Sequence, residues 1–464
     1  MKLLKKTAAA ALCAALTLTS VPVFAAETAS QTPDVKVQLN GKNVEFTDAA
    51  PVIKEGRTYV PFRAVFEALD VDSIEFDDAT KTIIAEDDGT TVKFTIGKTE
   101  MELTKDGTTT TQTLDAAAFI KNSRTYVPVR FAAQALDCKV GWDGDFKTVV
   151  ILDKEKLTED LDGQFTLMNK YSETAAKVTK ENPAFTGTLN LKLNMDNDGT
   201  PLVVAGSCDI KGKVDETEAI MNSAVKLDLN DLRKQLQAEE AIDDETEKVI
   251  TSAENFNFDM VMDMNSGMFY LSSSLLNTVF GTEDGTWYSL NFSELMAQGG
   301  MNFNFSDLMN LSTQGASYEN VVDELIDAAD INNSYAVQAM ASSVDMLKNM
   351  YADSAFKKDG SSYVSNYSYT ESGITTTCKT TLKADANDNI YGCKVEMTMK
   401  MAGSEIMTIT ADYENLDCAM DMYMNMMGAM ELKMDGSFKY QKTVDGLNTP
   451  GKNSKFQSLE EILF

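Results

Sequence analysis

Apolar and polar residues alternate along most of the second half of the chain. Alternation sends successive side chains to opposite faces of a strand, so these segments predict antiparallel strands joined by turns. The alternating segments are residues 186–193, 203–214, 219–229, 256–264, 268–271, 285–290, 361–369, 375–383, 390–401, 405–413, 419–427 and 430–441. Residues 231–240, 318–329 and 335–355 instead carry apolar residues at helical spacing. We therefore expect residues 184–445 to form one large antiparallel sheet with inserted helices.

The first part of the chain contains a duplicated unit. The heptad RTYVPFR at residues 57–63 returns as RTYVPVR at residues 124–130, and the match extends over roughly fifty residues. The residue before a proline prefers an extended backbone, and the apolar positions after the proline recur at helical spacing. Each copy therefore predicts a strand, a turn, a helix and a hairpin.

The repeated R-T-Y-V-P-x-R, followed by A-L-D and by an aromatic-Asp pair, resembles the bacterial copper amine oxidase N-terminal domain-like stalk domain. The resemblance covers about residues 35–153 and implies a non-catalytic domain of secreted and envelope proteins. The residues that carry this signature are Arg57, Pro61, Arg63, Asp77, Arg124, Pro128, Arg130, Trp142 and Asp143. We interpret them as structural, with ion pairs between the arginines and Asp48, Asp77, Asp115 and Asp143 that pin each helix to its hairpin, and with Phe76 and Trp142 in the core. The alternative is that the arginines bind an anionic polymer.

The second part resembles the half-open barrel of bacterial lipoprotein and lipid carrier proteins, through its strand order and the short strands at residues 267–271 and 287–290. The expected fold is thus α+β, with a duplicated stalk-type α/β-hairpin domain followed by a large half-barrel-like antiparallel sheet. Residues 154–182 carry a drifting helical stripe and predict a connecting helix that ends at Asn182-Pro183. Residues 446–464 are expected to be a tail.

The amino terminus has the pattern of a secretory signal peptide. Lysines precede an apolar run, and Val23-Phe24-Ala25 offers a cleavage site, so residues 1–25 are expected to be removed. We expect a secreted or extracellular protein, associated with the cell wall in one variant of this hypothesis, without a transmembrane segment after cleavage.

Composition narrows the chemistry. The net charge of −30 disfavours nucleic acid as a partner and suits a cell-wall polymer or an envelope protein. The chain has no histidine, which removes Ser-His-Asp and histidine-dependent zinc or copper sites. We therefore expect no catalytic residues, no cofactor and no metal, and a non-enzymatic binding or scaffold protein. The alternative function is an extracellular carboxylate-dependent hydrolase.

Five cysteines follow the predicted cleavage site, and two of them flank a predicted hairpin. Counting outwards from the turn at residues 384–388 places Cys378 and Cys393 nearly opposite each other. A cross-strand disulfide and a set of buried reduced thiols are both consistent with this count.

Methionine is concentrated late in the chain, where 21 of 26 lie beyond residue 255 and many alternate. Alternation places each set on one face of the sheet. The predicted ligand face consists of Met260, Met262, Met264, Met420, Met422, Met424 and Met426. Unbranched, polarizable thioethers either fill an ordinary core or line a deformable cavity for an apolar small molecule or lipid.

Overall fold

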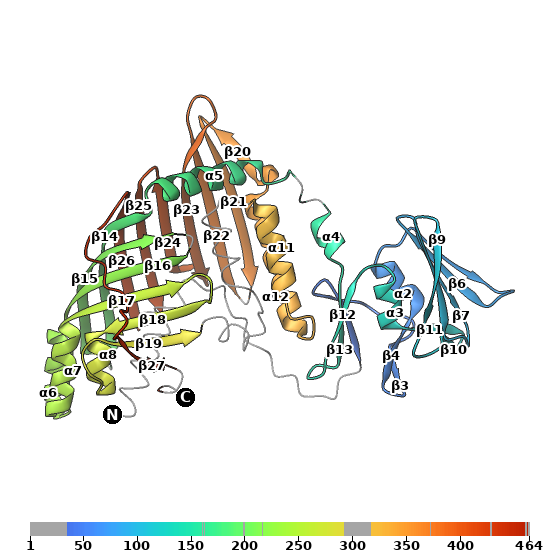
Figure 1. Ribbon diagram of the computed structural model, residues 1–464, viewed down its shortest axis with the longest axis horizontal. Helices are drawn as coiled ribbons and strands as arrows, with labels where there is room; N and C mark the ends of the chain where they lie inside the picture. Colours follow the sequence, from blue (N-terminus) through green and yellow to red (C-terminus); the bar gives the residue numbers. More distant parts are fainter. Residues whose placement is uncertain are drawn as a thin grey trace.

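The computed structural model describes residues 35–159, 161, 163–197, 200–215, 217–291, 317–371, 373–426, 429–459 and 462. The fold is α+β, as predicted, with a stalk at one end and a large curved sheet at the other (Figure 1). The predicted signal peptide lies outside the described residues. No described helix combines the length and the apolar character needed to cross a membrane.

The stalk is built from short strands and two short helices. Its strands are β1 (Lys36–Leu39), β2 (Lys42–Asn43), β3 (Val52–Lys54), β4 (Arg57–Pro61), β5 (Ser73–Asp77), β6 (Thr82–Asp87), β7 (Thr90–Thr95), β8 (Glu100–Lys105), β9 (Thr108–Thr113), β10 (Phe119–Lys121), β11 (Arg124–Pro128), β12 (Lys139–Asp143) and β13 (Thr148–Leu152), and its helices are α2 (Phe62–Ala68) and α3 (Val129–Gln134). Each repeat gives strand, turn, strand, helix and hairpin, which confirms the predicted unit. Both prolines cap their helix and do not occupy its first turn.

The two repeats interlock through one small sheet. Strand β4 of the first repeat pairs antiparallel with β11 of the second, in a sheet ordered β10-β11-β4-β3. The two hairpins diverge, since β5 and β6 continue into the sheet β5-β6-β7-β8-β9, whereas β12 and β13 join β1 and β2. The core between these sheets contains Phe62, Val65, Phe66 and Val129 from the predicted helix stripes.

The second domain is a 14-stranded sheet ordered β20-β21-β22-β23-β24-β25-β26-β14-β15-β16-β17-β18-β19-β27. Its strands are β14 (Ala184–Asn197), β15 (Thr200–Val214), β16 (Glu218–Asp228), β17 (Asn255–Asp263), β18 (Met268–Ser273), β19 (Thr286–Asn291), β20 (Phe356–Asp359), β21 (Ser362–Glu371), β22 (Ile374–Ala384), β23 (Ile390–Met401), β24 (Ser404–Glu414), β25 (Asp417–Met426), β26 (Met430–Gln441) and β27 (Lys455–Ser458). The late strands close back on β14, so that β26 and β14 are neighbours in the middle of the sheet.

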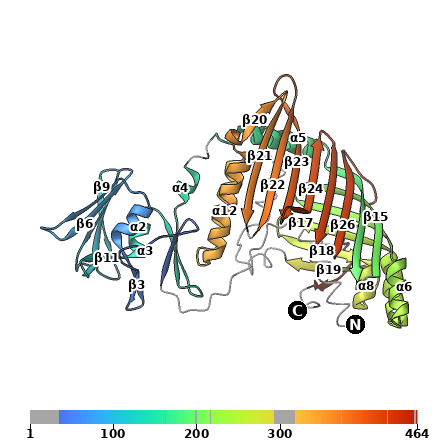
Figure 2. The ribbon, with the colours of Figure 1, turned by 180° about the vertical axis from the view of Figure 1, so that it is seen from behind.

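Helices accompany this sheet at its ends and along one edge (Figures 1 and 2). They are α4 (Lys154–Thr158), α5 (Thr166–Glu181), α6 (Asn230–Ala238), α7 (Asp244–Glu254), α8 (Ser274–Phe280), α11 (Tyr318–Ala328), α12 (Ser334–Tyr351) and the 3₁₀ turn η1 (Asp353–Ala355). The predicted single connecting helix is wrong, because α4 and α5 are separate. Helices α7 and α8 were not predicted. Helix α11, within the predicted range 318–329, buries Val322 and Ile326.

The predicted tail is partly structured. Residues 445–448 cross the sheet, where Lys211 donates to the Asp445 carbonyl at 3.0 Å and Asn448 donates to Asp259 at 2.7 Å. The chain then adds β27 as a parallel edge strand beside β19. Leu459 follows and packs into a cluster with Leu271.

The register of the β22–β23 hairpin excludes the disulfide. Cys378 lies opposite Met397, while Cys393 lies opposite Leu382, so the two cysteines are four pairs apart. At about 3.3 Å per residue this offset is roughly 13 Å, beyond the reach of a disulfide. All five described cysteines are free and buried.

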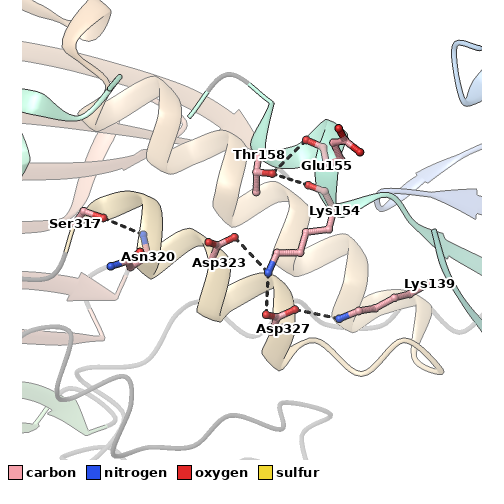
Figure 3. Close-up of polar contacts among 8 residues, drawn as sticks. All are labelled: Lys139, Lys154, Glu155, Thr158, Ser317, Asn320, Asp323 and Asp327. Atoms are coloured by element: carbon pink, nitrogen blue, oxygen red, sulfur yellow. Dashed lines mark hydrogen bonds and ion pairs between the residues drawn. The ribbon is translucent and has the colours of Figure 1, made fainter. Parts of the chain in front are cut away.

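The stalk docks on α11 and α12 through both apolar and polar contacts. Val150 and Leu152 of β13 pack against Val322 and Val337 in one buried cluster. Lys154 lies 2.8 Å from Asp327 and 3.3 Å from Asp323 of α11, and Lys139 of β12 also pairs with Asp327 at 3.0 Å (Figure 3). The stalk therefore lies directly against the helical edge of the sheet domain.

Candidate apolar binding face

One face of the 14-stranded sheet carries rows of apolar side chains that run across the strands. Directly opposite residues on neighbouring strands project from the same face, so the pairing register identifies each row. One row reads Cys378, Met397, Ile409, Met422, Met434, Leu191, Gly206 and Leu227. The next reads Thr376, Met399, Met407, Met424, Leu432, Leu193 and Val204. We call this face, from β22 to β18, the methionine face.

The seven predicted methionines all lie on this face, in two groups. Met420, Met422, Met424 and Met426 follow β25 near the middle of the sheet, whereas Met260, Met262 and Met264 belong to β17 and the turn after it. The row Met260, Met221, Gly212, Phe185 and Tyr440 connects the β17 group to β14 and β26. The hypothesis of a common face is thus consistent with the register.

Exposure differs among these side chains. Met262, Met264 and Met422 are buried, and Met260, Met420 and Met424 are half-buried. Met426 is 56% exposed, at the hairpin between β25 and β26. It belongs to the rim of the face, since its row continues to Met430, Met195 and Leu202.

Sequence reasoning missed most of the middle of the face. The missed side chains are Leu189, Leu191, Leu193, Met195, Met407, Ile409, Met430, Leu432 and Met434, most of them half-buried. Their alternation was visible, but the placement of β26 beside β14 was not. Pairing across 245 positions of sequence, as between Asn190 and Asp435, brings the two halves of the face together.

The rows of the methionine face contain no Asp, Glu, Lys or Arg between β22 and β18 within the described residues. The opposite face is charged. There Glu396 pairs with Lys394 at 2.9 Å and with Lys379 at 3.3 Å, and Lys383 contacts Asp412 at 2.6 Å and Glu414 at 2.7 Å. The sheet therefore has one uncharged, largely apolar face and one charged face.

Two glycines on the methionine face leave room for aromatic rings of the neighbouring strands. A Cβ on Gly187 would stand 2.4 Å from the ring of Phe438, and a Cβ on Gly212 would stand 2.4 Å from the ring of Phe185. Each ring thus occupies the space beside the glycine that a Cβ would fill. Glycine at such positions also permits a sheet to bend sharply.

Helices pack mainly on the outer strands of this face. Met168 of α5 shares a buried cluster with Leu382 and Cys393, and Figure 1 shows α5 running across one end of the strands. At the other end, Leu276 of α8 packs on Leu271. The main packing contacts between described helices and the sheet fall on β21, β23 and β15 to β18, leaving the central strands β24, β25, β26 and β14 outside them.

The buried thiol and phenol groups near α5 are neutral at physiological pH. Burial raises the pKa of the Cys393 thiol to about 12 and that of the Tyr351 phenol to about 12. Burial likewise raises the pKa of Tyr171, Tyr318 and Tyr413. The covered end of the face therefore adds no charge to it.

Within the described part of the chain, no three His, Cys, Asp or Glu side chains gather to hold a metal ion. Asp412 and Glu414 of the other face both contact Lys383. What the arrangement offers is a neutral apolar surface made largely of flexible side chains.

Two of the stalk signature arginines form ion pairs with aspartates that were among the predicted partners. Arg57 pairs with Asp115 at 2.9 Å, and Arg124 reaches Asp48 through two nitrogens. Each arginine thus pairs with the aspartate of the other repeat, whereas the prediction had these pairs pin a helix to the hairpin of its own repeat. The hydrogen bond from Arg124 lowers the pKa of Asp48.

The remaining signature residues have other roles. Arg63 pairs with Glu67 at 3.8 Å, Arg130 is exposed, and Asp77 accepts hydrogen bonds from its own turn, at 2.9 Å from the Ala79 amide. Trp142 packs partly buried against the stalk core, as predicted. Phe76 is 37% exposed and is not a core residue, which corrects that prediction.

Asp143 is the signature residue that joins the domains. Its carboxylate is 5% exposed and accepts hydrogen bonds from the Ser334 amide at 2.8 Å and the Ser334 hydroxyl at 2.7 Å. Burial raises its pKa, but the hydrogen bonds from Ser334 and from the amides of Phe146 and Asp145 outweigh burial and lower the pKa. The second aromatic-Asp pair thus serves docking.

The chain was compared with known proteins. The solved structures similar to it include a DUF1329 family protein from Desulfovibrio piger ATCC 29098 (8% identity, 61% of this chain, 95% of that chain, TM-score 0.21) and a LolA superfamily protein from Nitrosomonas europaea (8% identity, 59% and 93%, TM-score 0.18). At these scores the two structures carry no argument. No curated protein matches the chain. Residues 38–151 match the model of the copper amine oxidase N-terminal domain, as the repeated signature predicted.

Proposed function

We propose that this protein is a secreted or envelope-associated, non-enzymatic binding protein that holds an apolar ligand on the methionine face. In this proposal the stalk attaches or spaces the sheet domain at a cell-wall polymer or an envelope protein. The signal-peptide pattern of residues 1–25 supports export. The ligand would be a lipid or another molecule with a long apolar part.

One observation carries the proposal: the rows of the methionine face hold no charged side chain, while the opposite face is charged. A sheet with an apolar face and a polar face normally has the apolar face covered and the polar face in water. The main helix contacts cover the outer strands, and the central rows on β24 to β14 are half-buried. A bound apolar molecule over these rows would complete the cover.

The side chains of the central rows favour a ligand of variable shape. Met407, Met422, Met424 and Met434 are unbranched and adapt to different contacts at little cost. Each methylene that a ligand buries contributes about 0.8 kcal/mol, so a chain of several methylenes would bind without any polar anchor. The neutral thiol and phenol groups near α5 impose no charge on the ligand.

The test uses a fluorescent fatty acid titrated into the full chain, with a matched pair of variants on β24. Met407→Lys places a charge on the methionine face, and Thr408→Lys places the same charge one residue later on the opposite face. We expect Met407→Lys to weaken binding at least tenfold, because burying an ammonium under an apolar ligand is costly. Thr408→Lys should stay within twofold of the wild type.

Met422→Leu with Met424→Leu separates adaptability from simple apolarity. The double variant should lose less than about 1.5 kcal/mol of stability, because the substitution conserves volume and apolarity. Weaker binding in a folded double variant is expected if the face adapts to its ligand. The proposal is wrong if the folded wild type binds no apolar probe, or if the two lysine variants bind equally well.

A further inference from the structure

The edge strands of the four sheets differ in how they are protected. An edge strand presents unpaired backbone N–H and C=O groups, and proteins usually block it with charges, prolines, bulges or a covering element. The edges of the four described sheets are β2 and β12, β3 and β10, β5 and β9, and β20 and β27. Every one of these edge strands except β9 carries at least one charged side chain. Examples are Lys42 in β2, Lys139 in β12, Lys54 in β3, Lys121 in β10, Glu75 in β5, Lys358 in β20 and Lys455 in β27.

Among the described residues, strand β9 has none of the usual blocks. Its sequence is TTTTQT, and all six residues are exposed. Of the described strands it pairs with β8 alone, in an unbroken antiparallel register from Glu100 opposite Thr113 to Lys105 opposite Thr108. The strand is regular and β-branched, so it is already in the conformation that a further strand would require.

We propose that β9 is a self-association edge, at which a second copy of this chain adds its own β9 in antiparallel orientation. The five-stranded stalk sheets of the two copies would then form one continuous ten-stranded sheet around a two-fold axis. Such an axis lies midway between one residue and the same residue of the other copy. If the residue that faces its own copy is Thr110 or Thr111, every cross-strand pair within β9 is Thr with Thr or Thr with Gln.

A second copy fits this strand better than a charged partner does. The strand offers no charge for a cationic or anionic segment to recognise, whereas opposed threonines form favourable cross-strand pairs. A homodimer that shares the same patch on both copies is the commonest closed assembly.

The net negative charge of the chain predicts that the dimer becomes more stable as the salt concentration rises. Each copy carries a net charge of −30, so two copies repel each other at long range. The acidic Glu100 and Glu102 lie one strand away from the contact, on β8. Added salt screens charges beyond about 8 Å at physiological ionic strength, so the dimer should strengthen as salt is added.

Sedimentation velocity of the full chain over a range of concentrations tests the proposal. We expect a monomer–dimer equilibrium that tightens between 50 and 300 mM salt (about 13 to about 6 Å of screening length). Thr111→Lys should weaken it at least tenfold, because each added lysine faces the added lysine of the other copy or lies near it. Within one chain the new lysine lies opposite Glu102, so folding should be preserved.

Ala79→Lys is the matched control, since it adds the same charge at the exposed turn between β5 and β6 of the same sheet. It should leave the dimer at or above wild-type strength. A wild type that stays monomeric at roughly 200 µM and 300 mM salt (screening length about 6 Å) would overturn the proposal. So would a dimer that Thr111→Lys and Ala79→Lys affect equally.

Discussion

The contact between the stalk and the sheet domain depends on a glycine, which gives a direct test of domain coupling. Gly141 lies in β12 against the backbone of the loop between α11 and α12. A Cβ added there would stand 2.0 Å from the Ile331 carbonyl oxygen and 2.6 Å from its carbon. Real Cβ atoms do not approach backbone so closely, so Gly141→Ala must separate β12 from this loop.

The magnitude follows from the contacts beside Gly141. Separation would weaken the hydrogen bond from the Trp142 amide to Asn332, at 3.3 Å, and the two hydrogen bonds from Ser334 to the buried Asp143 carboxylate. Hydrogen bonds to a charged group contribute about 1.5–3 kcal/mol each. Since the apolar contacts of Val150 would partly persist, we expect a loss of about 3 kcal/mol. Ordinarily, Gly to Ala in a strand is favourable by about 0.5–1 kcal/mol.

Tryptophan fluorescence during denaturant unfolding measures this loss, because the chain has two tryptophans. Trp142 lies at the junction and Trp287 is buried in the sheet domain. Single Trp→Phe variants allow each domain to be followed separately. In Gly141→Ala the transition reported by Trp142 should move to lower denaturant, away from that of Trp287.

Gly144→Ala is the control, because its Cβ would meet its nearest neighbour, Trp142 Nε1, at 3.7 Å, an ordinary contact. It should leave both transitions within about 0.5 kcal/mol of the wild type. Equal effects of the two substitutions, or no effect of Gly141→Ala, would refute the reasoning that the close backbone approach couples the domains.

Two further predictions concern the same junction and the stalk. The lowered pKa of Asp143 means that its stabilising contribution is present above the ordinary value of 3.8 and is lost as pH falls below that value through the native pKa; acid titration of stability should show this loss, and Ser334→Ala should reduce it. Residues 35–153 made alone should unfold cooperatively, with Val150 and Leu152 newly exposed. Replacing both by Thr should therefore improve the solubility of the fragment and lower its free energy of unfolding by no more than about 1 kcal/mol. In that fragment Pro128→Gly should cost on the order of 1 kcal/mol, and a fragment without a cooperative transition would show that the stalk needs the second domain.

The sequence by itself determined the local elements and the duplicated unit. Period-two alternation located most strands of the large sheet to within a few residues, because a two-sided sheet requires an apolar and a polar face. The repeated proline and apolar stripe located α2 and α3. Short helices such as α7 and α8 escaped prediction, since α8 spans only seven residues and its packing, not its periodicity, stabilises it.

Only the tertiary structure decided which faces and residues come together. Register depends on pairing between distant strands, on where each turn closes and on bulges. In the β22–β23 hairpin the turn closes with Ala384 opposite Ile390, and the bulge between Lys383 and Ala384 adds one residue to the offset between Cys378 and Cys393. A shift of one residue would send a row to the other face. The methionine face therefore became visible only when β26 was placed beside β14. Likewise, Asp143 serves domain docking because Ser334, 191 positions away, lies against it.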